Sequence, residues 1–509
     1  MSVRSLITIG SDAILVDIQC HLSNNLPNIV IVGFANKAVD EARERLRGAF
    51  ASARLKLPRK RIVINLAPAD IPKADSGFDL AIAVAIFYAD SQIALPDEAI
   101  YIGELGLDGQ TRSVRGIIGK LLAGRAKGIT NYYIPTSNLA QATLVPSLKL
   151  YPVSSIGELH YHLTGLSTIE PVYTDTDIAS QNEMSHNVEQ FSGRGVMSQV
   201  VGQARAKRAL EISAAGAHNI LLSGPPGTGK SMLAKAMPSI MPELNHEEIL
   251  EVTQIHSLTS FDYDQIIFER PFQAPHHSAS HTSVIGGGAN LKPGQISLAH
   301  HGILYLDELP EFSRQTLEAL RQPLEDHQIS ISRVKSSAIY PAKFILVATA
   351  NPCPCGFYGH EAAGDCHCLP QQILRYRQKL SGPIIDRIDL HASVHEVDHE
   401  TLLLQEPDPD VDTQNRQRVR TARNIQQLRQ NGQLNAHLAN GQLKDISQLE
   451  PAAKVLLDNA ARKLNMSARG YMRTVKVART IADLENQASV SPAHISEAVA
   501  YRPQLNSPV

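Results

Sequence analysis

Long apolar stretches are missing from this sequence. No run reaches the roughly eighteen apolar residues that a membrane-spanning helix needs, so we expect no transmembrane segment. The first residues, Met1 to Ala13, also lack the apolar core followed by small residues that marks a secretory signal peptide. These two absences predict a cytoplasmic protein.

A strong net charge is also missing. The 48 basic and 50 acidic residues give a formal net charge of −2, so any nucleic-acid partner must bind local basic patches and not the field of the whole molecule. At 509 residues the chain is long enough for roughly two to four domains. Its composition, 43% hydrophobic and 19% charged, is that of an ordinary soluble protein.

The most specific motif is a glycine-rich loop between a strand and a helix. The apolar run 220–222 predicts a buried strand, and residues 232–236 predict a helix. The loop between them fits G-x-x-x-x-G-K-[ST], in which backbone N–H groups face a triphosphate, the lysine reaches the β- and γ-phosphates and the hydroxyl holds Mg²⁺. We prefer this nucleotide-binding interpretation to an ordinary Gly-Pro turn. The loop consists of Gly224, Pro225, Pro226, Gly227, Thr228, Gly229, Lys230 and Ser231.

Two later strands end in polar side chains that complement the loop. Residues 303–306 lead into Asp307 and Glu308, where the first carboxylate can support Mg²⁺ and the second can polarise the attacking water. Residues 344–350 lead into Asn351, which is suited to orient that water. A turn-forming asparagine before Pro352 has the same signature, so this alternative stays open.

The N-terminal residues resemble a protease domain that has lost its catalytic pair. Residues 72–79 and 103–120 resemble the proteolytic domain of Lon-type proteases, which uses a serine activated by a lysine. In register, Gly77 takes the place of the serine and Ile118 that of the lysine. Ser76 and Lys120 lie one or two positions away, an offset that would aim their side chains elsewhere. We therefore predict a Lon-like fold without its chemistry.

The order of the motifs resembles a known family. The phosphate loop, Asp307-Glu308, Asn351 and then Arg387 resemble the AAA+ ATPases in their magnesium-chelatase-like branch. Residues 271–278 and 351–356, with the Lon-like segment, narrow the resemblance to the bacterial ComM competence family, also called YifB-type. The resemblance spans roughly residues 1–505 and implies ATP and Mg²⁺ as ligands.

This resemblance implies roles for two arginines. It places the arginine finger that acts on a neighbouring subunit at Arg387, and the second sensor at Arg469 on a helical lid over the nucleotide. A finger supplied in trans stabilises charge on the transferring phosphoryl group and couples hydrolysis to the interface. The alternative for Arg387 is an intrachain salt bridge with Asp386 or Asp389. The resemblance also implies a ring, expected to be a homo-hexamer.

The motifs divide the chain into four segments. We expect an α+β Lon-protease-like domain of the ribosomal S5 domain 2-like class at 1–166 and a polar linker at 167–197. An α/β AAA+ P-loop core follows at 198–397, with a cysteine-containing insert at 353–368. The last segment, 398–509, has a helical composition and forms the predicted lid.

Two inserts of the core are candidates to face the substrate. The first, from Pro271 to Lys292, carries His276 and His277, which we assign to a substrate loop in preference to a zinc site. The second, 328–337, alternates as a β-hairpin that places Arg333 and Lys335 on one face, as phosphate contacts require. Neither insert offers stacked aromatic residues, so we expect sequence-tolerant contacts with the DNA backbone.

Four of the five cysteines lie within sixteen positions. Cys353, Cys355, Cys366 and Cys368 form C-x-C, ten residues, C-x-C. In a chain of cytosolic type this clustering indicates metal and not disulfides, and four thiolates suit a structural tetrahedral Zn²⁺. Four reduced cysteines without a ligand, or an iron–sulfur cluster, are the alternatives.

The function that we predict is an ATP-dependent, ring-forming DNA motor. The resemblance implies helicase activity and branch migration of recombination intermediates during natural transformation. Possible partners are single-stranded or branched DNA and recombination proteins, with no membrane. The alternative is a protein-remodelling ATPase of the magnesium-chelatase type, and an ATP-dependent protease comes third because the serine and lysine are displaced.

Overall fold

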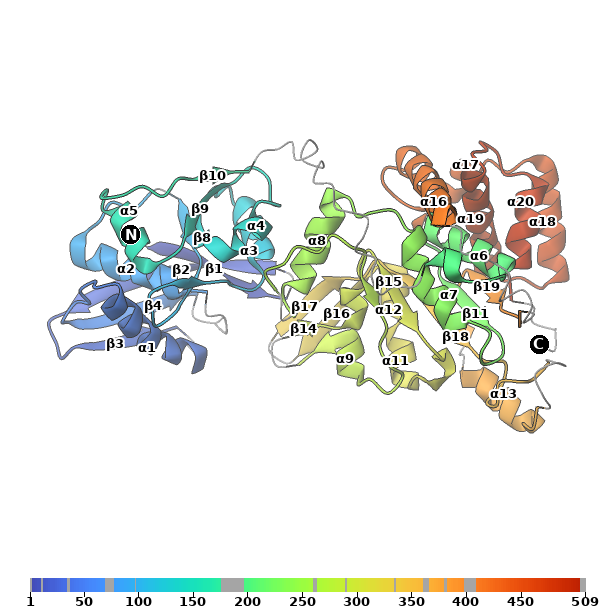
Figure 1. Ribbon diagram of the computed structural model, residues 1–509, viewed down its shortest axis with the longest axis horizontal. Helices are drawn as coiled ribbons and strands as arrows, with labels where there is room; N and C mark the ends of the chain where they lie inside the picture. Colours follow the sequence, from blue (N-terminus) through green and yellow to red (C-terminus); the bar gives the residue numbers. More distant parts are fainter. Residues whose placement is uncertain are drawn as a thin grey trace.

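The fold is described from a computed structural model. It covers residues 2–10, 12–33, 37–68, 77–96, 98–174, 196–259, 263–288, 291–333, 336–359, 366–379, 382–397 and 409–503. A sheet-rich N-terminal part, a central part with a second sheet and a C-terminal group of helices follow one another along the long axis (Figure 1). None of the described helices combines the length and apolar character needed to cross a membrane.

A mixed eight-stranded sheet organises the N-terminal part. Its strand order is β10-β9-β8-β5-β1-β2-β4-β3, and β1 pairs antiparallel with β2 but parallel with β5. Helix α2 is buried from Asp79 to Phe87 because its sequence is apolar on nearly all sides. The elements of this part are β1 (Val3–Ile9), β2 (Asp12–Ser23), β3 (Asn28–Val32), α1 (Lys37–Ser52), β4 (Arg61–Ala67), α2 (Asp79–Ser91), β5 (Ala99–Tyr101), β6 (Glu104–Leu105), β7 (Thr111–Arg112), α3 (Ile117–Arg125), β8 (Asn131–Pro135), α4 (Leu139–Ala142), β9 (Lys149–Val153), α5 (Ile156–Leu163) and β10 (Val172–Tyr173).

The positions of the predicted protease pair are only partly described. Ser76 lies outside the described residues, whereas Gly77 is described. Ile118 and Lys120 both belong to α3 and are completely buried. The domain without protease chemistry therefore stays a prediction, which rests on the sequence register that puts Gly77 in the place of the serine and Ile118 in that of the lysine.

A parallel five-stranded sheet organises the central part. Its order is β12-β15-β18-β11-β19, and every pair in it is parallel. All six residues of β18 are buried, as in a sheet covered on both faces. The elements are α6 (Ala204–Gly216), β11 (Ile220–Ser223), α7 (Lys230–Ala236), α8 (His246–His256), β12 (Phe272–Gln273), α9 (His281–Ile285), β13 (Gly286–Gly287), β14 (Lys292–Pro293), α10 (Gln295–Leu298), β15 (Ile303–Leu306), α11 (Arg314–Ala319), α12 (Arg321–Asp326), β16 (Gln328–Arg333), β17 (Ser336–Pro341), β18 (Ile345–Ala350), α13 (Pro370–Lys379), α14 (Gly382–Ile385) and β19 (Leu390–Ser393).

The parallel arrangement gives the central sheet two chemically different edges. The strands all end at one edge, which we call the carboxyl edge, and all begin at the other, the amino edge. Ligands of open parallel sheets bind outside the carboxyl ends of the strands. The predicted strands 220–222, 303–306 and 344–350 are confirmed as β11, β15 and β18.

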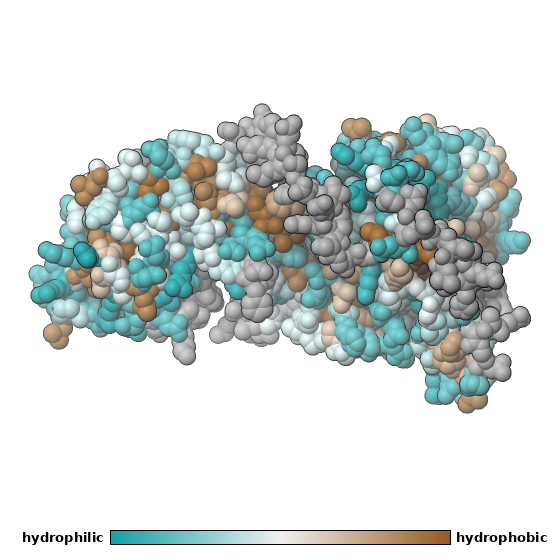
Figure 2. Space-filling view, in the orientation of Figure 1, coloured by the Kyte–Doolittle hydropathy of each residue, from teal (hydrophilic) through white to brown (hydrophobic). Residues whose placement is uncertain are grey.

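The C-terminal helices share a hydrophobic core with the central part. Val475 and Ile481 of the last long helix belong to the same buried cluster as Ile220 and Leu222 of β11. Arg423 donates two hydrogen bonds to the Ala214 carbonyl oxygen at the end of α6, at 2.9 and 2.7 Å. The helices are α16 (Pro409–Arg429), α17 (Asn440–Ser447), α18 (Pro451–Lys463), α19 (Ala468–Leu484) and α20 (Pro492–Ala500). On the face shown in Figure 2, hydrophilic residues dominate their surface.

A polar junction joins the N-terminal part to the central part. The Ser113 hydroxyl donates to the Tyr263 hydroxyl at 3.0 Å, and the Arg115 guanidinium lies 4.4 Å from the centre of the same ring. The Gln141 amide donates to the carbonyl oxygens of Tyr263 and Gln265 at 3.0 and 2.8 Å. These contacts join α4 and the residues before α3 to the segment that follows α8.

Candidate functional site

The phosphate loop lies at the carboxyl edge between β11 and α7, as predicted. Gly227 and Gly229 have φ angles of +81° and +87°, which residues with a side chain rarely adopt. The Lys230 ammonium donates to the carbonyl oxygens of Gly224 and Pro225 at 2.8 and 2.6 Å. Burial lowers the pKa of Lys230, while Asp307 and Glu308 oppose that shift. The lysine is thus held inside the loop, close to the two carboxylates.

The two carboxylates follow β15 and reach the loop from the neighbouring strand. The Ser231 hydroxyl donates to Asp307 at 3.3 Å, and the Thr349 hydroxyl donates to the same carboxylate at 2.6 Å. The backbone N–H of Glu308 donates to the Thr349 hydroxyl at 2.9 Å, which fixes the turn that carries both acids. Burial alone would raise the pKa of Asp307, but these hydrogen bonds, led by Thr349, lower it. A serine hydroxyl beside an ionised carboxylate is a donor set that Mg²⁺ accepts.

The predicted polar amide reaches the same edge. Strands β18 and β11 pair so that Ala350 lies opposite Ser223, and the Gly224 N–H donates to the Ala350 carbonyl oxygen at 3.3 Å. Asn351, the next residue, therefore lies level with the start of the phosphate loop, and it is half-buried. The structure thus brings together the phosphate loop, Asp307, Glu308 and Asn351, in the arrangement that the sequence predicts.

The sequence analysis missed Thr349. This residue is completely buried in β18, yet its hydroxyl links the Asp307 carboxylate to the Glu308 backbone. A threonine near the end of a predicted strand is common, because β-branched residues favour strands. Thr349 is distinguished only by its position two residues before Asn351. That position is informative only when it is known that β18 lies beside β15, which leads into Asp307.

Arg387 lies at the opposite edge of the sheet from the phosphate loop of its own chain. Its carbonyl oxygen accepts a hydrogen bond from the Asn219 side chain at 3.0 Å, just before β11 begins. At ~3.3 Å per residue, the five steps from Asn219 to Gly224 span roughly 16 Å. The arginine is therefore too distant to act on its own nucleotide.

Arg387 does form a salt bridge within its own chain, but the partner is neither Asp386 nor Asp389, as the alternative had it. The guanidinium pairs with Glu325 of α12 at 2.7 Å, and Asp389 instead pairs with Arg473. Of the two expected carboxylates, Asp386 contributes only a longer-range attraction. Glu325 lies 62 positions earlier in the chain, and only the fold brings it to the amino edge.

Arg469 also lies at the amino edge. It belongs to the first turn of α19, and its guanidinium pairs with the same Glu325 carboxylate that binds Arg387. The next turn carries Arg473, whose partner Asp389 accepts a hydrogen bond from the Asn219 backbone at 3.2 Å. Within its own chain Arg469 therefore lies away from the phosphate loop, at the edge where the strands begin, and its role as second sensor stays a prediction.

The four clustered cysteines meet next to the phosphate loop. The Cys353 sulfur lies 3.2 Å from that of Cys355 and 3.7 Å from that of Cys366, and all four sulfurs lie within 4.8 Å of one another. Four sulfurs around one Zn²⁺ at ~2.3 Å lie roughly 3.8 Å apart, so the cluster fits a tetrahedral site. Hydrogen bonds, led by the one from the Phe357 N–H and followed by that with Cys353, lower the pKa of Cys355. The predicted ligands Cys353, Cys355, Cys366 and Cys368 thus come together in space.

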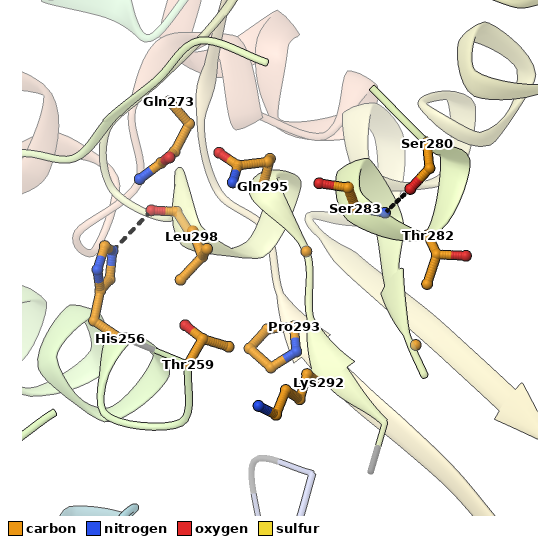
Figure 3. Close-up of a pocket in the computed structure, with 12 residues that line it drawn as sticks. His256, Thr259, Gln273, Ser280, Thr282, Ser283, Lys292, Pro293, Gln295 and Leu298 are labelled. Atoms are coloured by element: carbon orange, nitrogen blue, oxygen red, sulfur yellow. Dashed lines mark hydrogen bonds between the residues drawn. The ribbon is translucent and has the colours of Figure 1, made fainter. Parts of the chain in front are cut away.

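The first insert surrounds a polar cavity. His276 and His277 are exposed, with their rings 4.1 Å apart, and the His276 ring contacts the Ser278 hydroxyl at 2.7 Å. Lys292 begins β14 and faces a cavity of about 570 Å³ together with Thr282 and other hydroxyl and amide side chains (Figure 3). The cavity lies among α8, α9 and α10, away from the phosphate loop. Its wall is suited to polar ligands and offers one lysine among the described residues.

The second insert is confirmed as an antiparallel hairpin. Gln328 of β16 pairs with Pro341 of β17, and the register runs to Arg333 and Ser336. The inner face is buried, and the Tyr340 hydroxyl donates to the Leu291 carbonyl oxygen at 2.6 Å, which anchors the hairpin to the first insert. Lys335 lies outside the described residues, and Arg333 is described only as the last residue of β16.

The structure also forms a histidine–carboxylate cluster that the sequence analysis missed. The Glu251 carboxylate lies 2.8 Å from a ring nitrogen of His300 and 2.7 Å from one of His301. The other ring nitrogen of His300 accepts the Lys343 N–H at 3.0 Å, so the nitrogen facing Glu251 carries the proton. This tautomer has no lone pair directed at a shared metal. We therefore interpret the cluster as a hydrogen-bonded support between α8 and β15.

Three family models match successive parts of the chain. Residues 18–138 match "Subunit ChlI of Mg-chelatase", residues 196–402 match "Magnesium chelatase, subunit ChlI", and residues 412–502 match "Magnesium chelatase, subunit ChlI C-terminal". The chain is 40% identical over 508 residues to competence protein ComM of Haemophilus influenzae, covering 98% of this chain and 97% of that protein. It is 39% identical over 508 residues to YifB of Escherichia coli, covering 98% and 96%. It is also 23% identical over 338 residues to the magnesium-chelatase subunit ChlI of Nephroselmis olivacea, covering 59% and 85%.

Proposed function

The chain belongs to the ComM and YifB family of magnesium-chelatase-like AAA+ ATPases, and from this premise we propose that it is a ring-forming motor that moves DNA. The observation that carries the proposal is the division of one ATPase site between two edges of the sheet. The phosphate loop and its acids lie at the carboxyl edge, and Arg387 lies at the amino edge. A second copy of the chain has to bring the two together.

Within one copy, the carboxyl edge supplies the groups for ATP binding and water attack. Lys230 binds phosphate oxygens when it leaves the carbonyl oxygens that now hold it. Ser231 and Asp307, 3.3 Å apart, fit Mg²⁺, which neutralises phosphate charge when bound. Glu308 polarises the attacking water and Asn351 orients it. What supports these four roles is that the residues proposed for them all follow strands that end at this edge, or belong to the phosphate loop.

The arrangement of the edges favours a closed ring. An interface that joins the carboxyl edge of one copy to the amino edge of the next is head-to-tail, and such interfaces generate rings when the rotation closes. We propose a homo-hexamer, in which Arg387 and Arg469 of each copy face the nucleotide of its neighbour. Nucleotide cleavage then changes the contact between copies and moves the inserts.

DNA is the substrate that we propose for this motor. The relative from Haemophilus influenzae carries the name competence protein, and the resemblance to the ComM family implies DNA as the substrate. The two inserts supply polar and basic groups for backbone contact: Lys292 on the cavity wall, His276 and His277 on the surface, and the predicted Arg333 and Lys335 of the hairpin. Branch migration of recombination intermediates, with unwinding as a helicase, is the reaction that we propose.

A direct test compares the ATPase rate with and without single-stranded, duplex and branched DNA. We expect branched DNA to stimulate hydrolysis most, and we expect the protein with ATP and Mg²⁺ to move three- or four-way junctions. Intact hydrolysis without DNA binding at low salt would remove the DNA role, since phosphate contacts strengthen as salt falls. The ATPase proposal would survive that result.

A protein-remodelling ATPase is the second candidate. All three family models carry the magnesium-chelatase name, and that likeness covers the nucleotide site. Stimulation of hydrolysis by a protein partner but not by any DNA would favour this candidate. We do not propose a protease, because in register with Lon-type proteases Gly77 takes the place of the serine and Ile118 that of the lysine.

We further propose that the cysteine cluster holds a structural Zn²⁺. The sulfur separations of 3.2 to 3.7 Å are close to those around one tetrahedral ion. The turn that carries Cys353 and Cys355 packs on the phosphate loop, because a Cβ at Gly356 would lie 2.5 Å from the Pro226 ring. Elemental analysis of the purified protein should give one zinc per chain. A metal-free protein with unchanged thermal stability would contradict this assignment.

A further inference from the structure

We propose that Glu325 is a carboxylate latch that holds Arg387 and Arg469 in the separate subunit until a phosphate group takes its place. The ligand that releases the latch is the nucleotide triphosphate bound to a second copy of this chain. This inference rests on the proposed ring. It concerns which group pairs with the two arginines of the amino edge before the ring forms.

One carboxylate serves both arginines. Glu325 binds the Arg387 guanidinium through one oxygen at 2.7 Å and the Arg469 guanidinium through the other oxygen. The two arginines come from segments 82 positions apart, just before β19 and in the first turn of α19. A single anion therefore gathers the two cations at one place, and this is the geometry that a phosphate with several oxygens requires.

The other cations nearby already have partners within the chain. Arg473 pairs with Asp389, which also lies 3.5 Å from His218. The Lys476 ammonium donates to the carbonyl oxygens of Ala436 and Leu438 at 3.1 and 2.6 Å. The fold fixes the partners of these groups. The Glu325 carboxylate is therefore the group at the amino edge that a phosphate can replace.

Exposure makes this exchange accessible. The Glu325 side chain is 39% exposed and that of Arg469 is 41% exposed, whereas that of Arg387 is only 10% exposed. Glu325 and Arg469 also line a cavity of about 500 Å³ between α12 and α19. Glu325 is the second-last residue of a six-residue helix, so its side chain can swing into solvent without moving the sheet. An incoming phosphate then meets two arginines that are already positioned.

The latch opposes assembly, because breaking it precedes the contact with the neighbouring nucleotide. In the separate subunit the carboxylate also offsets one of the two positive charges that would otherwise attract any anion. Removing the carboxylate should therefore favour nucleotide-dependent assembly at lower protein concentration. Since exposed ion pairs contribute modestly, we expect the concentration for half-maximal ATPase activity to fall about threefold or more in Glu325→Gln.

The experiment measures ATPase activity and particle mass against protein concentration in three variants. Glu325→Gln removes the charge, and Glu325→Asp keeps the charge but shortens its reach, so both should lower the assembly concentration. Asp326→Asn removes the same charge from the adjacent residue and should leave the assembly concentration where it is. Unchanged or weaker assembly in Glu325→Gln would overturn the latch, and so would an equal shift in Asp326→Asn.

Two controls separate the latch from the proposed function. If the unaltered protein shows no ATP-dependent assembly, the ring itself fails and the latch fails with it. If the unaltered protein assembles and Arg387→Ala abolishes hydrolysis, yet Glu325→Gln behaves like the unaltered protein, only the latch fails. Thermal unfolding of Glu325→Gln is measured alongside, and Glu325→Ala provides a second variant without the carboxylate.

Discussion

Replacing Arg387 by alanine tests the shared active site most informatively. The phosphate loop of this variant is intact, because Arg387 lies roughly 16 Å away at the other edge of the sheet. Its ATP should bind as before, whereas hydrolysis should fall about 10³-fold, the effect of removing an arginine finger. Binding of a fluorescent ATP analogue and phosphate release by the same samples give the two readouts.

Mixing variants turns the prediction into a test of geometry. Lys230→Ala lacks a working phosphate loop but keeps Arg387, so each variant alone is inactive. In a random equal mixture, roughly one quarter of head-to-tail interfaces pair an intact loop with an intact arginine, so about one quarter of the original rate should return. Each restored interface needs an intact arginine from only one of its two copies, because the other copy supplies the phosphate loop.

The same mixture can refute the reasoning. No recovery at any ratio, with assembly of both variants verified by particle mass, would mean that the arginine acts within its own chain. Full ATPase activity of Arg387→Ala alone would also refute the reasoning, because Arg387 would then not be needed for hydrolysis. As a control for surface charge, Arg314→Ala alters an arginine whose side chain is 90% exposed and should hydrolyse ATP normally.

Four further predictions concern single groups. Lys230→Ala should abolish turnover because no other cation replaces its ammonium inside the loop, as measured by phosphate release. Glu308→Gln should bind ATP and retain it without hydrolysis, because an amide does not polarise the attacking water; filter binding of labelled ATP distinguishes trapping from lost affinity. Thr349→Val removes the hydrogen bond that lowers the Asp307 pKa, so that pKa rises and the acid limb of the ATPase pH profile should move to higher pH. Cys366→Ser should lose the bound zinc and lower the melting temperature, whereas Cys20→Ser, outside the cluster, should keep its zinc.

The carboxyl edge was predictable from sequence because each of its parts follows a short apolar run. A parallel sheet brings the ends of such strands together whatever their order, so the phosphate loop, Asp307-Glu308 and Asn351 met as expected. The cysteines are close in sequence, and the short spacing within each pair predicted their convergence. In these cases local sequence carries nearly all of the positional information.

The amino edge was not predictable in the same way. Its chemistry depends on Glu325, Arg387 and Arg469, which lie in three separate segments of the chain and share no motif. The path of the C-terminal helices decides which edge α19 approaches, and helical periodicity alone does not specify that path. Thr349 was missed for a related reason, since its role depends on which strand lies beside β18.

The most direct test of the shared site is the particle mass of Glu308→Gln with ATP, Mg²⁺ and branched DNA. This variant should retain its nucleotide, so the proposed assembly should persist long enough to be weighed. We predict a closed ring on DNA, with six copies of the chain. A population that stays monomeric at saturating ATP and DNA would contradict the claim that neighbouring copies complete one another's nucleotide sites.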